Sequence, residues 1–388
     1  MKKGKKKYVF VVQVTRQLSV DILNAFVRSG AEIVLLTGSV EYNYEAPNKD
    51  IKIRYFNKYK NASFTSRIVS GIYFTIATFF YLLFRSRRNE LILVSTPPFS
   101  FYTAWFLKKI RGQKYHLVVW DLYPDVLVNL KILSKNNVLI KCWSKLNKWA
   151  FHNASSIFTL GMGMDKAIRN YTTVDPVIIP NWVESSFIVP LRKEENSFVK
   201  DHHLQDKLVV LYSGNLGLTH DVEAIVSAAK ELAFDTSIKF VIIGDGPKLP
   251  MIKEFVNANQ LTNVLILPYQ DKSVLPYSLT SADICIVTLS KGAESVSVPS
   301  KTYYSMAAGA SIFAIASNDS ELGAIIKNHN CGYVFEEYTP VDLSNAIVKL
   351  KENKELLDTF KFNARKASLN YTPQNAYKYY EIISNSTR

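Results

Sequence analysis

Cysteine is scarce in this sequence. Only Cys142, Cys285 and Cys331 occur in 388 residues, and each lies in apolar surroundings. An odd number of widely spaced cysteines argues against a disulfide framework and indicates buried thiols in a reducing compartment. At this length, and with 48% hydrophobic residues, the chain can fill the cores of two globular domains.

Acidic residues are scarce in the first half of the chain. Residues 1–190 hold 27 Lys and Arg against 11 Asp and Glu, a charge of +16, whereas residues 191–388 hold 20 against 22, a charge of −2. A basic half is attracted to nucleic acid or to an anionic membrane surface. Because there is no zinc spacing, helix-turn-helix signature or aromatic RNA-binding strand, we expect no nucleic-acid partner and favour the membrane.

One apolar run interrupts the pattern of a globular domain. From Ile68 to Phe84 there are 17 residues without a charge, preceded by Arg67 and followed by three further arginines. This length is at the lower limit for a membrane span, and the run contains small and polar residues. We predict a buried or interfacial helix with peripheral attachment; a spanning helix and a core helix without a membrane role are the alternatives.

The chain begins with lysines, but the apolar run after them is short and interrupted, and no small-residue cleavage site follows. We therefore interpret this start as a first β-strand rather than a signal peptide.

Short apolar runs alternate with helical patterns in both halves. The predicted strands are YVFVVQV, EIVLLTG, LILVST, YHLVVW, SIFTLG and PVIIP in the first half, and KLVVLYSG, KFVIIGDG, NVLILPY, ICIVTL, SIFAIA and GYVFE in the second. This alternation predicts two α/β domains with parallel sheets. A polar, proline-bearing segment after VIIP marks the boundary, which gives domains at residues 1–182 and 183–372.

A glycine turn stands at the start of the second half. The stretch SGNLGLTH, residues 213–220, follows a buried strand and precedes a helix predicted over residues 221–232. Glycine lets the main chain approach an anion, and free backbone N–H groups at a helix start attract phosphate. Gly214, Asn215 and Leu216 are therefore candidates for phosphate binding; an ordinary strand-to-helix connection is the alternative.

Later segments favour the phosphate interpretation. FVIIGDGPKLPMIKEF repeats the pattern of strand, glycine turn and helix around Gly244, and LPYQ places Tyr269 after the next strand. The loop in GAESVSVPSKTYYSMAAG then brings Glu294, Ser300 and Lys301 to the start of another helix. For Glu294 and Lys301 a solvated loop is the alternative.

The order of these motifs resembles the retaining glycosyltransferases of family 4, which have the GT-B fold of two facing Rossmann-like domains with a cleft between them. The resemblance covers nearly the whole chain and is strongest from VIIPNW to GYVFE. The run VPSKTYYSMAAG is most similar to the bacterial branch that builds surface polysaccharides, including N-acetyl-L-fucosaminyl transferases. In the first half, the paired prolines of VSTPPFSF and the segment WDLYPDVL are similar to the same branch.

The resemblance implies a diphosphate site in which several family positions have changed. Where the family places two cations at the glycine turn, this chain has Asn215 and His220, so Lys301 is the candidate that neutralises the leaving diphosphate. Where the family places two glutamates, the chain has Val296 and Tyr304, with Glu294 as a nearby substitute.

In the first domain, Asp121 lies at the end of a predicted strand, where it could orient an acceptor hydroxyl. Asp125 could share that role or cap the following helix. The first strand lacks the family's glycine-rich turn, so Arg16 or Gln17 either reaches the cleft or lies on the surface.

The resemblance implies transfer of a sugar, with retention, from a nucleotide-diphosphate donor. UDP-sugars are favoured, and the acceptor would be a polyprenyl-diphosphate-linked saccharide of cell-surface polysaccharide biosynthesis, such as O-antigen or capsule. Catalysis is assigned to Asp121 and Lys301. The donor-binding candidates are Gly214, Asn215, Leu216, Gly244, Tyr269, Glu294, Ser300, Lys301 and Tyr304.

The resemblance also implies that residues 373–388 form a helix that crosses back to the first domain. We expect a cytoplasmic enzyme bound peripherally to the inner membrane. We expect no cofactor, because the nucleotide-sugar is a substrate, and no metal, because no Asp-x-Asp pair follows a strand.

Three alternatives remain open. A nucleotide-sugar 2-epimerase shares the GT-B architecture. A nicotinamide-dependent oxidoreductase also uses glycine turns, although neither half shows a full G-x-G-x-x-G with a later acidic residue. A non-catalytic membrane adaptor would account for the missing glutamates.

Overall fold

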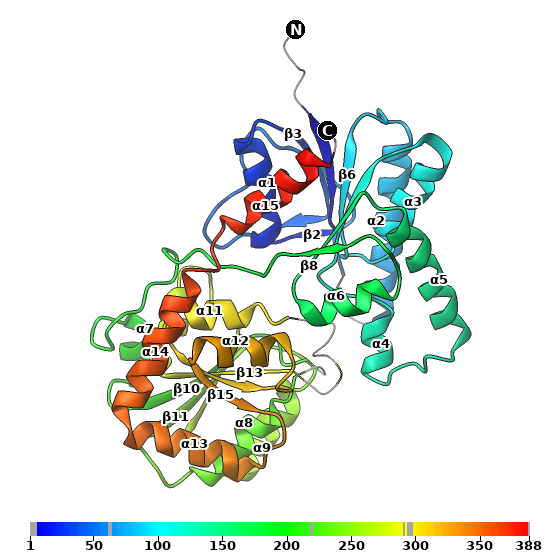
Figure 1. Cartoon of the computed structure of the whole chain (residues 1–388). Coiled ribbons are helices and arrows are strands. Elements are labelled where there is room, and N and C mark those ends of the chain that lie inside the picture. The colour runs from blue at the N-terminus through cyan, green and yellow to red at the C-terminus, as the bar shows by residue number, and fades with distance from the viewer. Residues whose placement is uncertain (1–5, 61–63, 218–219, 290–291, 293–297, 387–388) are drawn as a thin grey trace. The chain divides into compact units, whose positions relative to one another are not determined.

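The computed structural model describes residues 6–60, 64–217, 220–289, 292 and 298–386. The chain forms two compact units (Figure 1). Unit 1 contains the residues up to Asn181 and those from Pro373 onward, and unit 2 runs from Trp182 to Thr372. These limits lie within one residue of the boundaries expected from the sequence.

Unit 1 is built on a parallel sheet in the order β5-β3-β1-β6-β7-β8-β9. Its strands are β1 (Lys7–Val11), β3 (Glu32–Thr37), β5 (Lys52–Tyr55), β6 (Glu90–Val94), β7 (Tyr115–Val118), β8 (Ser156–Thr159) and β9 (Pro176–Ile178). The central strands are buried on both faces, which is why they appear in the sequence as continuous apolar runs.

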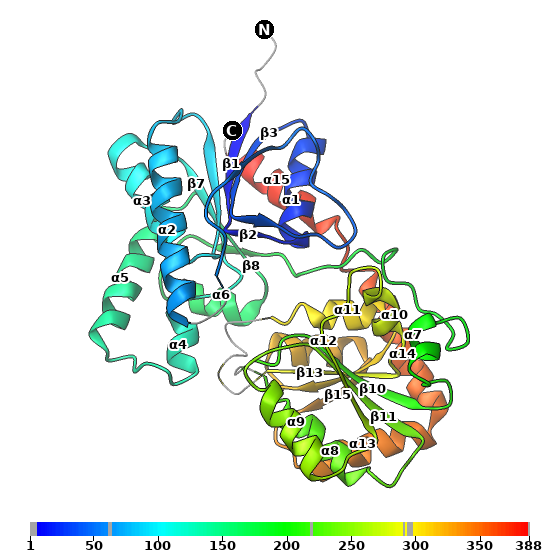
Figure 2. The same ribbon diagram turned by 180° about the vertical axis from the view of Figure 1, so that it is seen from behind.

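Seven helices surround this sheet in the described part of unit 1. They are α1 (Gln17–Arg28), α2 (Phe64–Leu83), α3 (Ser100–Arg111), α4 (Asp125–Asn129), α5 (Val138–His152), α6 (Met162–Arg169) and α15 (Asn375–Asn385). The last helix, α15, packs on α1 in unit 1, where the rings of Phe26 and Tyr380 meet edge to face. Helices α2, α3 and α5 lie beside one another away from α1 (Figure 2).

Unit 2 repeats the architecture with the strand order β12-β11-β10-β13-β14-β15. Its strands are β10 (Leu208–Ser213), β11 (Ile238–Ile243), β12 (Val264–Leu267), β13 (Ile284–Thr288), β14 (Ser311–Ile315) and β15 (Gly332–Phe335). Its helices are α7 (Ser197–Asp201), α8 (Glu223–Glu231), α9 (Leu249–Ala258), α10 (Leu275–Thr280), α11 (Lys301–Ala307), α12 (Glu321–His329), α13 (Pro340–Glu352) and α14 (Lys354–Ser368).

Both sheets have the Rossmann strand order, in which the chain starts at the centre and reverses direction across the sheet. The reversal lies between β1 and β6 in unit 1 and between β10 and β13 in unit 2. Ligands of such sheets bind outside the carboxyl ends of the strands at this point. The fold class predicted from the sequence, α/β with two Rossmann-like domains, is confirmed.

Some features were missed or predicted wrongly. Strand β5 is an edge strand with an exposed polar surface, so it lacks an apolar signal, and β2 (Val14–Thr15) and β4 (Ser39–Val40) form a short two-stranded sheet. Cys142 is exposed on α5, contrary to the expectation that all three thiols are buried.

Asp283 ties several segments of unit 2 together at the amino end of β13. Its buried carboxylate pairs with Lys193 (2.6 Å) and Lys361 (3.0 Å) and accepts the amide of Val209 (3.0 Å). Burial alone would raise the pKa of Asp283, but the two ammonium groups outweigh it and lower the pKa.

We predict that Asp283→Ala lowers the free energy of unfolding by roughly 3 kcal/mol, because two cations and an amide lose their buried partner. Since the pKa is lower in the folded state, this contribution is present above the carboxyl's unfolded pKa and is lost as the pH falls through its folded pKa. Urea unfolding at several pH values measures it. Asp235→Ala, which breaks a more exposed pair with Lys351, is the control and should cost less than about 1 kcal/mol.

Candidate active site

The glycine turn after β10 packs against the turn after β11. The amide of Gly214 donates to the carbonyl of Ile243 (2.9 Å), and the amide of Leu216 donates to the carbonyl of Asp245 (2.9 Å). The expectation that these amides are free to bind phosphate is therefore wrong for both residues. The side chain of Leu216 is buried, whereas Asn215 between them is exposed.

Gly244 makes this packing possible. Its φ is +149°, and a Cβ atom there would lie 1.9 Å from the carbonyl oxygen of Gly214, which the backbone cannot accommodate. The two strand-end turns thus touch through their main chains. Only glycine permits so close an approach.

Lys301, the first residue of α11, reaches back over the glycine turn. Its Nζ donates to the hydroxyl of Tyr212 (2.8 Å), which in turn donates to the carbonyl of Asn215 (2.7 Å). The ammonium also lies 4.1 Å from the centroid of the Tyr212 ring. A Cβ on Gly214 would stand 3.3 Å from this Nζ, so glycine leaves the space that the lysine fills.

Burial lowers the pKa of Lys301 to about 7. Among the residues that the structure describes, no carboxylate forms an ion pair with it. Within the described part of the chain this ammonium therefore has no anionic partner, and it lies near the point where the strand order of unit 2 reverses.

His220 cannot share the charge of Lys301. Burial, reinforced by the charges of Lys301 and Lys248, lowers the pKa of His220 to about 4, so the imidazole is neutral at pH 7. Its Nδ1 lies 2.8 Å from the carbonyl oxygen of Thr288 and donates to it. Lys248 is itself occupied by Glu223 and by the carbonyl of His220.

A depression of about 430 Å³ adjoins the turn after β11. Gly244, Tyr269 and Lys253 line it, together with apolar residues of β12 and α9. Tyr269 is 56% exposed, and its ring lines the depression. The structure therefore brings Gly244 and Tyr269 together, as expected.

The remaining candidates of unit 2 lie around α11. Ser300 is exposed immediately before the helix, and Tyr304 is half-buried within it. Glu294 and Val296 lie outside the described residues. Within the described residues no cluster of His, Cys, Asp and Glu is arranged to hold a metal ion.

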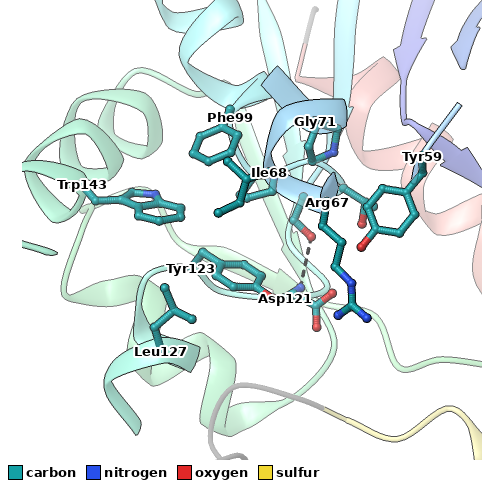
Figure 3. A pocket seen from close by; sticks show the side chains of 13 residues that line it. Tyr59, Arg67, Ile68, Gly71, Phe99, Asp121, Tyr123, Leu127 and Trp143 are labelled. Atoms are coloured by element: carbon teal, nitrogen blue, oxygen red, sulfur yellow. Dashed lines mark hydrogen bonds between the residues drawn. The ribbon is translucent and has the colours of Figure 1, made fainter. Parts of the chain in front are cut away.

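Unit 1 contains a cavity of about 240 Å³ at the carboxyl ends of β6 and β7 (Figure 3). The amide of Asp121 donates to Ser95 Oγ (3.1 Å), which fixes the loop that presents the carboxylate. Asp121 and Arg67 lie on one side of the cavity in Figure 3, and Phe99 and Trp143 lie on the other. The surrounding protein removes the carboxyl group of Asp121 from water, which raises its pKa, and the positive charge of Arg16 opposes this increase.

Apolar groups make up much of the cavity wall. Trp143 stacks on Phe99 (centroids 5.3 Å apart) and on Tyr123 (6.1 Å). A flat aromatic wall opposite a carboxylate and a guanidinium can hold a ligand that has both apolar and hydroxyl-bearing faces. The cavity thus places Asp121 in a setting suited to a saccharide.

The other polar candidates of unit 1 have local partners. Asp125 is the first residue of α4 rather than its cap, and its carboxylate accepts the hydroxyl of Tyr171 (2.6 Å). Gln17 is buried and bonds Asp21 and the backbone of residues 43–45, while Arg16 pairs with Glu41 on the surface (3.6 Å).

Sequence reasoning missed Tyr212, Arg67 and Trp143. Tyr212 lies within a strand that was interpreted as core, and Arg67 was seen only as the flank of an apolar run. Trp143 reaches the cavity from α5, a helix far along the chain. Phe99 and Tyr123 lie in the segments VSTPPFSF and WDLYPDVL that the sequence analysis singled out, but neither residue was named as a candidate.

Comparisons with known proteins bear on both units. Residues 193–367 match the family model of group 1 glycosyl transferases, which covers most of unit 2. A Pseudomonas aeruginosa protein named a probable glycosyltransferase, WbjE, is 28% identical over 275 residues, covering 69% of this chain and 68% of that protein. These matches indicate a transferase enzyme.

Another relative of the transferase is the Escherichia coli protein WcaI, provisionally named a colanic acid biosynthesis glycosyl transferase. It is 25% identical over 274 residues, covering 69% of this chain and 67% of WcaI.

Solved structures with the same fold cover almost the whole transferase. WaaG, a glycosyltransferase involved in lipopolysaccharide biosynthesis, superposes with a TM-score of 0.71 at 13% identity, covering 95% of this chain and 98% of WaaG. Anabaena HepE in complex with UDP and glucose superposes with a TM-score of 0.73 at 10% identity, covering 98% of this chain and 100% of HepE. At such identities the likeness concerns the fold, which is GT-B.

We predict that Gly214→Ala weakens donor binding by about tenfold, because the new methyl group stands against Lys301 Nζ and displaces the ammonium. Gly30→Ala is a matched control: Gly30 also has a positive φ, of +87°, but nothing lies within 4 Å of its Cβ position. Both variants should lose roughly 1 kcal/mol of stability from backbone strain. Calorimetric titration with nucleotide-sugars separates them, and equal donor affinity in the two would contradict a link between Gly214 and Lys301.

Proposed function

We propose that the transferase moves a sugar, with retention of configuration, from a nucleotide-diphosphate donor to a lipid-linked saccharide in cell-surface polysaccharide biosynthesis. The observation that carries this proposal is the position of Lys301, a half-buried ammonium that reaches the glycine turn of a Rossmann-like domain and has no anionic partner among the described residues. The pathways named for WcaI and WaaG support polysaccharide biosynthesis as the setting.

Unit 2 is proposed to bind the donor. The diphosphate would lie over Asn215 beside Lys301, and the base would stack on Tyr269 in the neighbouring depression. Gly244 and Leu216 hold the two turns in place, and Ser300, just before α11, and Tyr304, within it, are the remaining described donor-binding candidates. The UDP bound to HepE favours UDP-sugars as the first donors to test.

Lys301 would act on the leaving group. As the glycosidic bond to the diphosphate breaks, negative charge grows on the departing oxygen, and a fixed ammonium stabilises that charge more than it stabilises the bound donor. The neutral His220 leaves this role to Lys301. We expect no cofactor in this chemistry, because the nucleotide itself leaves.

The cavity of unit 1 is proposed to hold the acceptor. Asp121 would accept a hydrogen bond from the attacking hydroxyl, and the wall around Trp143 would pack against the sugar ring. A polyprenyl-diphosphate carrier would suit the basic character of this half, with the enzyme on the inner leaflet of the cytoplasmic membrane. Because the run VPSKTYYSMAAG resembles N-acetyl-L-fucosaminyl transferases, nucleotide-activated N-acetyl-L-fucosamine should be among the donors that are tested.

The other activities considered from the sequence are less well supported. A nicotinamide-dependent oxidoreductase does not account for the group 1 match. A 2-epimerase would have no use for an acceptor cavity beside Asp121. A non-catalytic adaptor would not need a cation at the glycine turn that lacks a carboxylate partner among the described residues.

We predict that donor affinity is greatest below pH 7 and falls above it. Lys301 loses its proton near pH 7 in the free enzyme, whereas a bound diphosphate favours the charged form and raises the pKa. Affinity should therefore fall roughly tenfold per pH unit above 7 until the pKa of the complex is reached. Calorimetric titration of a UDP-sugar from pH 6 to 8.5 measures this. It should also detect proton uptake above pH 7.

The control for this pH series is Lys301→Gln, which should bind the donor weakly with no pH dependence in that range. Its turnover should be lower by about 10² or more, the effect of one lost transition-state contact. A wild-type pH profile in Lys301→Gln would show that another group receives the diphosphate.

We predict that Asp121→Asn lowers turnover about 10²-fold while donor affinity is unchanged, because the carboxylate acts on the acceptor alone. Asp125→Asn is the matched control four residues away: an amide oxygen can still accept the Tyr171 hydroxyl, so turnover should stay within about twofold. Initial rates with saturating donor and varied acceptor decide the question. Loss of donor affinity in Asp121→Asn would contradict the division of roles between the units.

A further inference from the structure

Three neighbouring helices of unit 1 carry no acidic residue. Helices α2, α3 and α5 contain no Asp or Glu along their whole lengths, but they contain seven basic residues: Arg67, Lys108, Lys109, Arg111, Lys141, Lys145 and Lys148. Helix α3 packs against both α2 and α5 (Figure 2). The three helices therefore form one continuous positively charged side of the unit.

The same side exposes large apolar residues. On α2 the exposed residues recur every three or four positions, which gives one stripe along the helix: Val69, Ile72, Tyr73, Ile76 and Phe80. Phe106 and Ile110 continue the exposed apolar surface on α3, and Val138, Leu139 and Trp149 continue it on α5. We call these ten residues, with the seven basic ones, the α2-α3-α5 face.

Aromatic rings join the three helices across this face. Phe79 of α2 contacts Phe80 (centroids 5.5 Å apart) and Phe106 of α3 (5.7 Å). Trp105 of α3 stacks on Trp149 of α5 (5.2 Å), and the Lys145 ammonium lies over the Trp149 ring (5.3 Å). Basic residues interleaved with exposed aromatic and aliphatic side chains are typical of protein surfaces at the headgroup level of a bilayer.

Helix α2 is long and apolar enough to cross a membrane by length and composition alone, yet its contacts tie it to the domain. Phe74, Thr78 and Leu82 are buried on its inner side. The carbonyl of Ser70 accepts hydrogen bonds from Gln13 (3.0 Å) and Asn57 (2.9 Å), and Arg111 donates to the carbonyl of Leu82 (2.8 Å). A spanning orientation would break these contacts, whereas an orientation parallel to the bilayer plane keeps all of them.

The three helices of the face also line the cavity that contains Asp121. Arg67, Ile68 and Gly71 come from the first turns of α2, Phe99 immediately precedes α3, and Trp143 lies on α5. A headgroup attached to a membrane lipid could therefore enter the cavity while its lipid chain stays in the bilayer. Arg67, for which no carboxylate partner occurs among the described residues, is placed to meet the phosphate of such a headgroup.

We propose that the α2-α3-α5 face docks on an anionic phospholipid bilayer with α2 in the plane of the interface, and that the cavity receives the acceptor headgroup from that bilayer. This inference rests on the proposed function for the identity of the acceptor. The bilayer is favoured over a protein partner because the charge of the face has one sign throughout and its apolar residues form a broad band.

The test is sedimentation of the purified full-length chain with phosphatidylcholine vesicles, with and without phosphatidylglycerol. Wild-type protein should bind the anionic vesicles at least tenfold more strongly than the neutral ones, and binding should weaken with salt. Ile76→Glu with Phe80→Glu should reduce binding more than tenfold, because both side chains are about half exposed on the stripe. Phe234→Glu, which alters a 99% exposed phenylalanine of unit 2, is the matched control and should bind as the wild type does.

A second variant separates charge from apolar insertion. Lys109→Gln with Lys145→Gln and Lys148→Gln should remove most of the preference for phosphatidylglycerol and most of the salt dependence. Thermal midpoints within a few degrees of the wild type would show that these surface variants remain folded. Protein docked in the plane of the bilayer should be released from vesicles by alkaline carbonate.

Three results would overturn the proposal. The first is unchanged vesicle binding by Ile76→Glu with Phe80→Glu. The second is retention of the wild type through alkaline carbonate, which would indicate a spanning α2. The third is a wild-type dimer that ignores vesicles and dissociates in the double variant, which would assign the face to a second copy of the chain.

Donor affinity and transfer to a short-chain soluble acceptor are measured without vesicles in the same proteins. Transfer without vesicle binding would refute the docking face alone. Vesicle binding without donor affinity would refute the proposed function alone.

Discussion

The geometry of the candidate site in unit 2 depends on the placement of one ammonium group, that of Lys301, for which no counter-ion occurs among the described residues. Removing Lys301 from water costs free energy, and the hydroxyl and ring of Tyr212 offset only part of that cost, so its pKa lies near 7. A surface lysine would be charged at all times and would interact with any passing anion. Under the proposed function, a bound diphosphate would favour the charged form of Lys301 and raise its pKa.

Several other features of unit 2 serve this placement. The main-chain contact between Gly244 and Gly214 fixes the two strand-end turns at a separation that side chains would prevent. Tyr212 connects the ammonium to the carbonyl of Asn215, so the charge and the turn move as one element. His220, held neutral by burial and by neighbouring cations, adds no competing positive charge. The resemblance implies a pair of cations at this turn, and in this chain Lys301 brings one ammonium to the turn from the other side of the strand reversal.

The fold was largely predictable from the sequence, whereas the site was predictable only in part, and the physical reasons differ. Buried parallel strands such as β10 and β13 must be apolar on both faces, so each leaves a local signal that needs no tertiary information. β5 was missed because an exposed edge strand carries no such pattern. Lys301 and Asp121 could be named as candidates from the sequence because they stand at a helix start and at a strand end. Tyr212, Arg67 and Trp143 belong to the site through contacts between distant segments. The expectation of free amides at Gly214 and Leu216 was wrong. The sequence of one turn does not show that carbonyl groups of the neighbouring turn already accept hydrogen bonds from these amides.

The absence of acidic residues from α2, α3 and α5 has no explanation in the fold of unit 1, because all three helices would pack equally well with carboxylates on their outer surfaces. The three acidic residues between residues 64 and 152 are Glu90, Asp121 and Asp125. Glu90 contacts His116, Asp125 accepts from Tyr171, and Asp121 lines the cavity, so none of them lies on the three helices. The surface of these three helices lacks negative charge and exposes aromatic rings, and we attribute this composition to the partner that the surface contacts. The same helices line the cavity that contains Asp121, so the cavity and this surface have a fixed orientation relative to each other. One rigid group of helices would then hold both Asp121, which is proposed to contact the acceptor, and the surface that is proposed to dock on the bilayer.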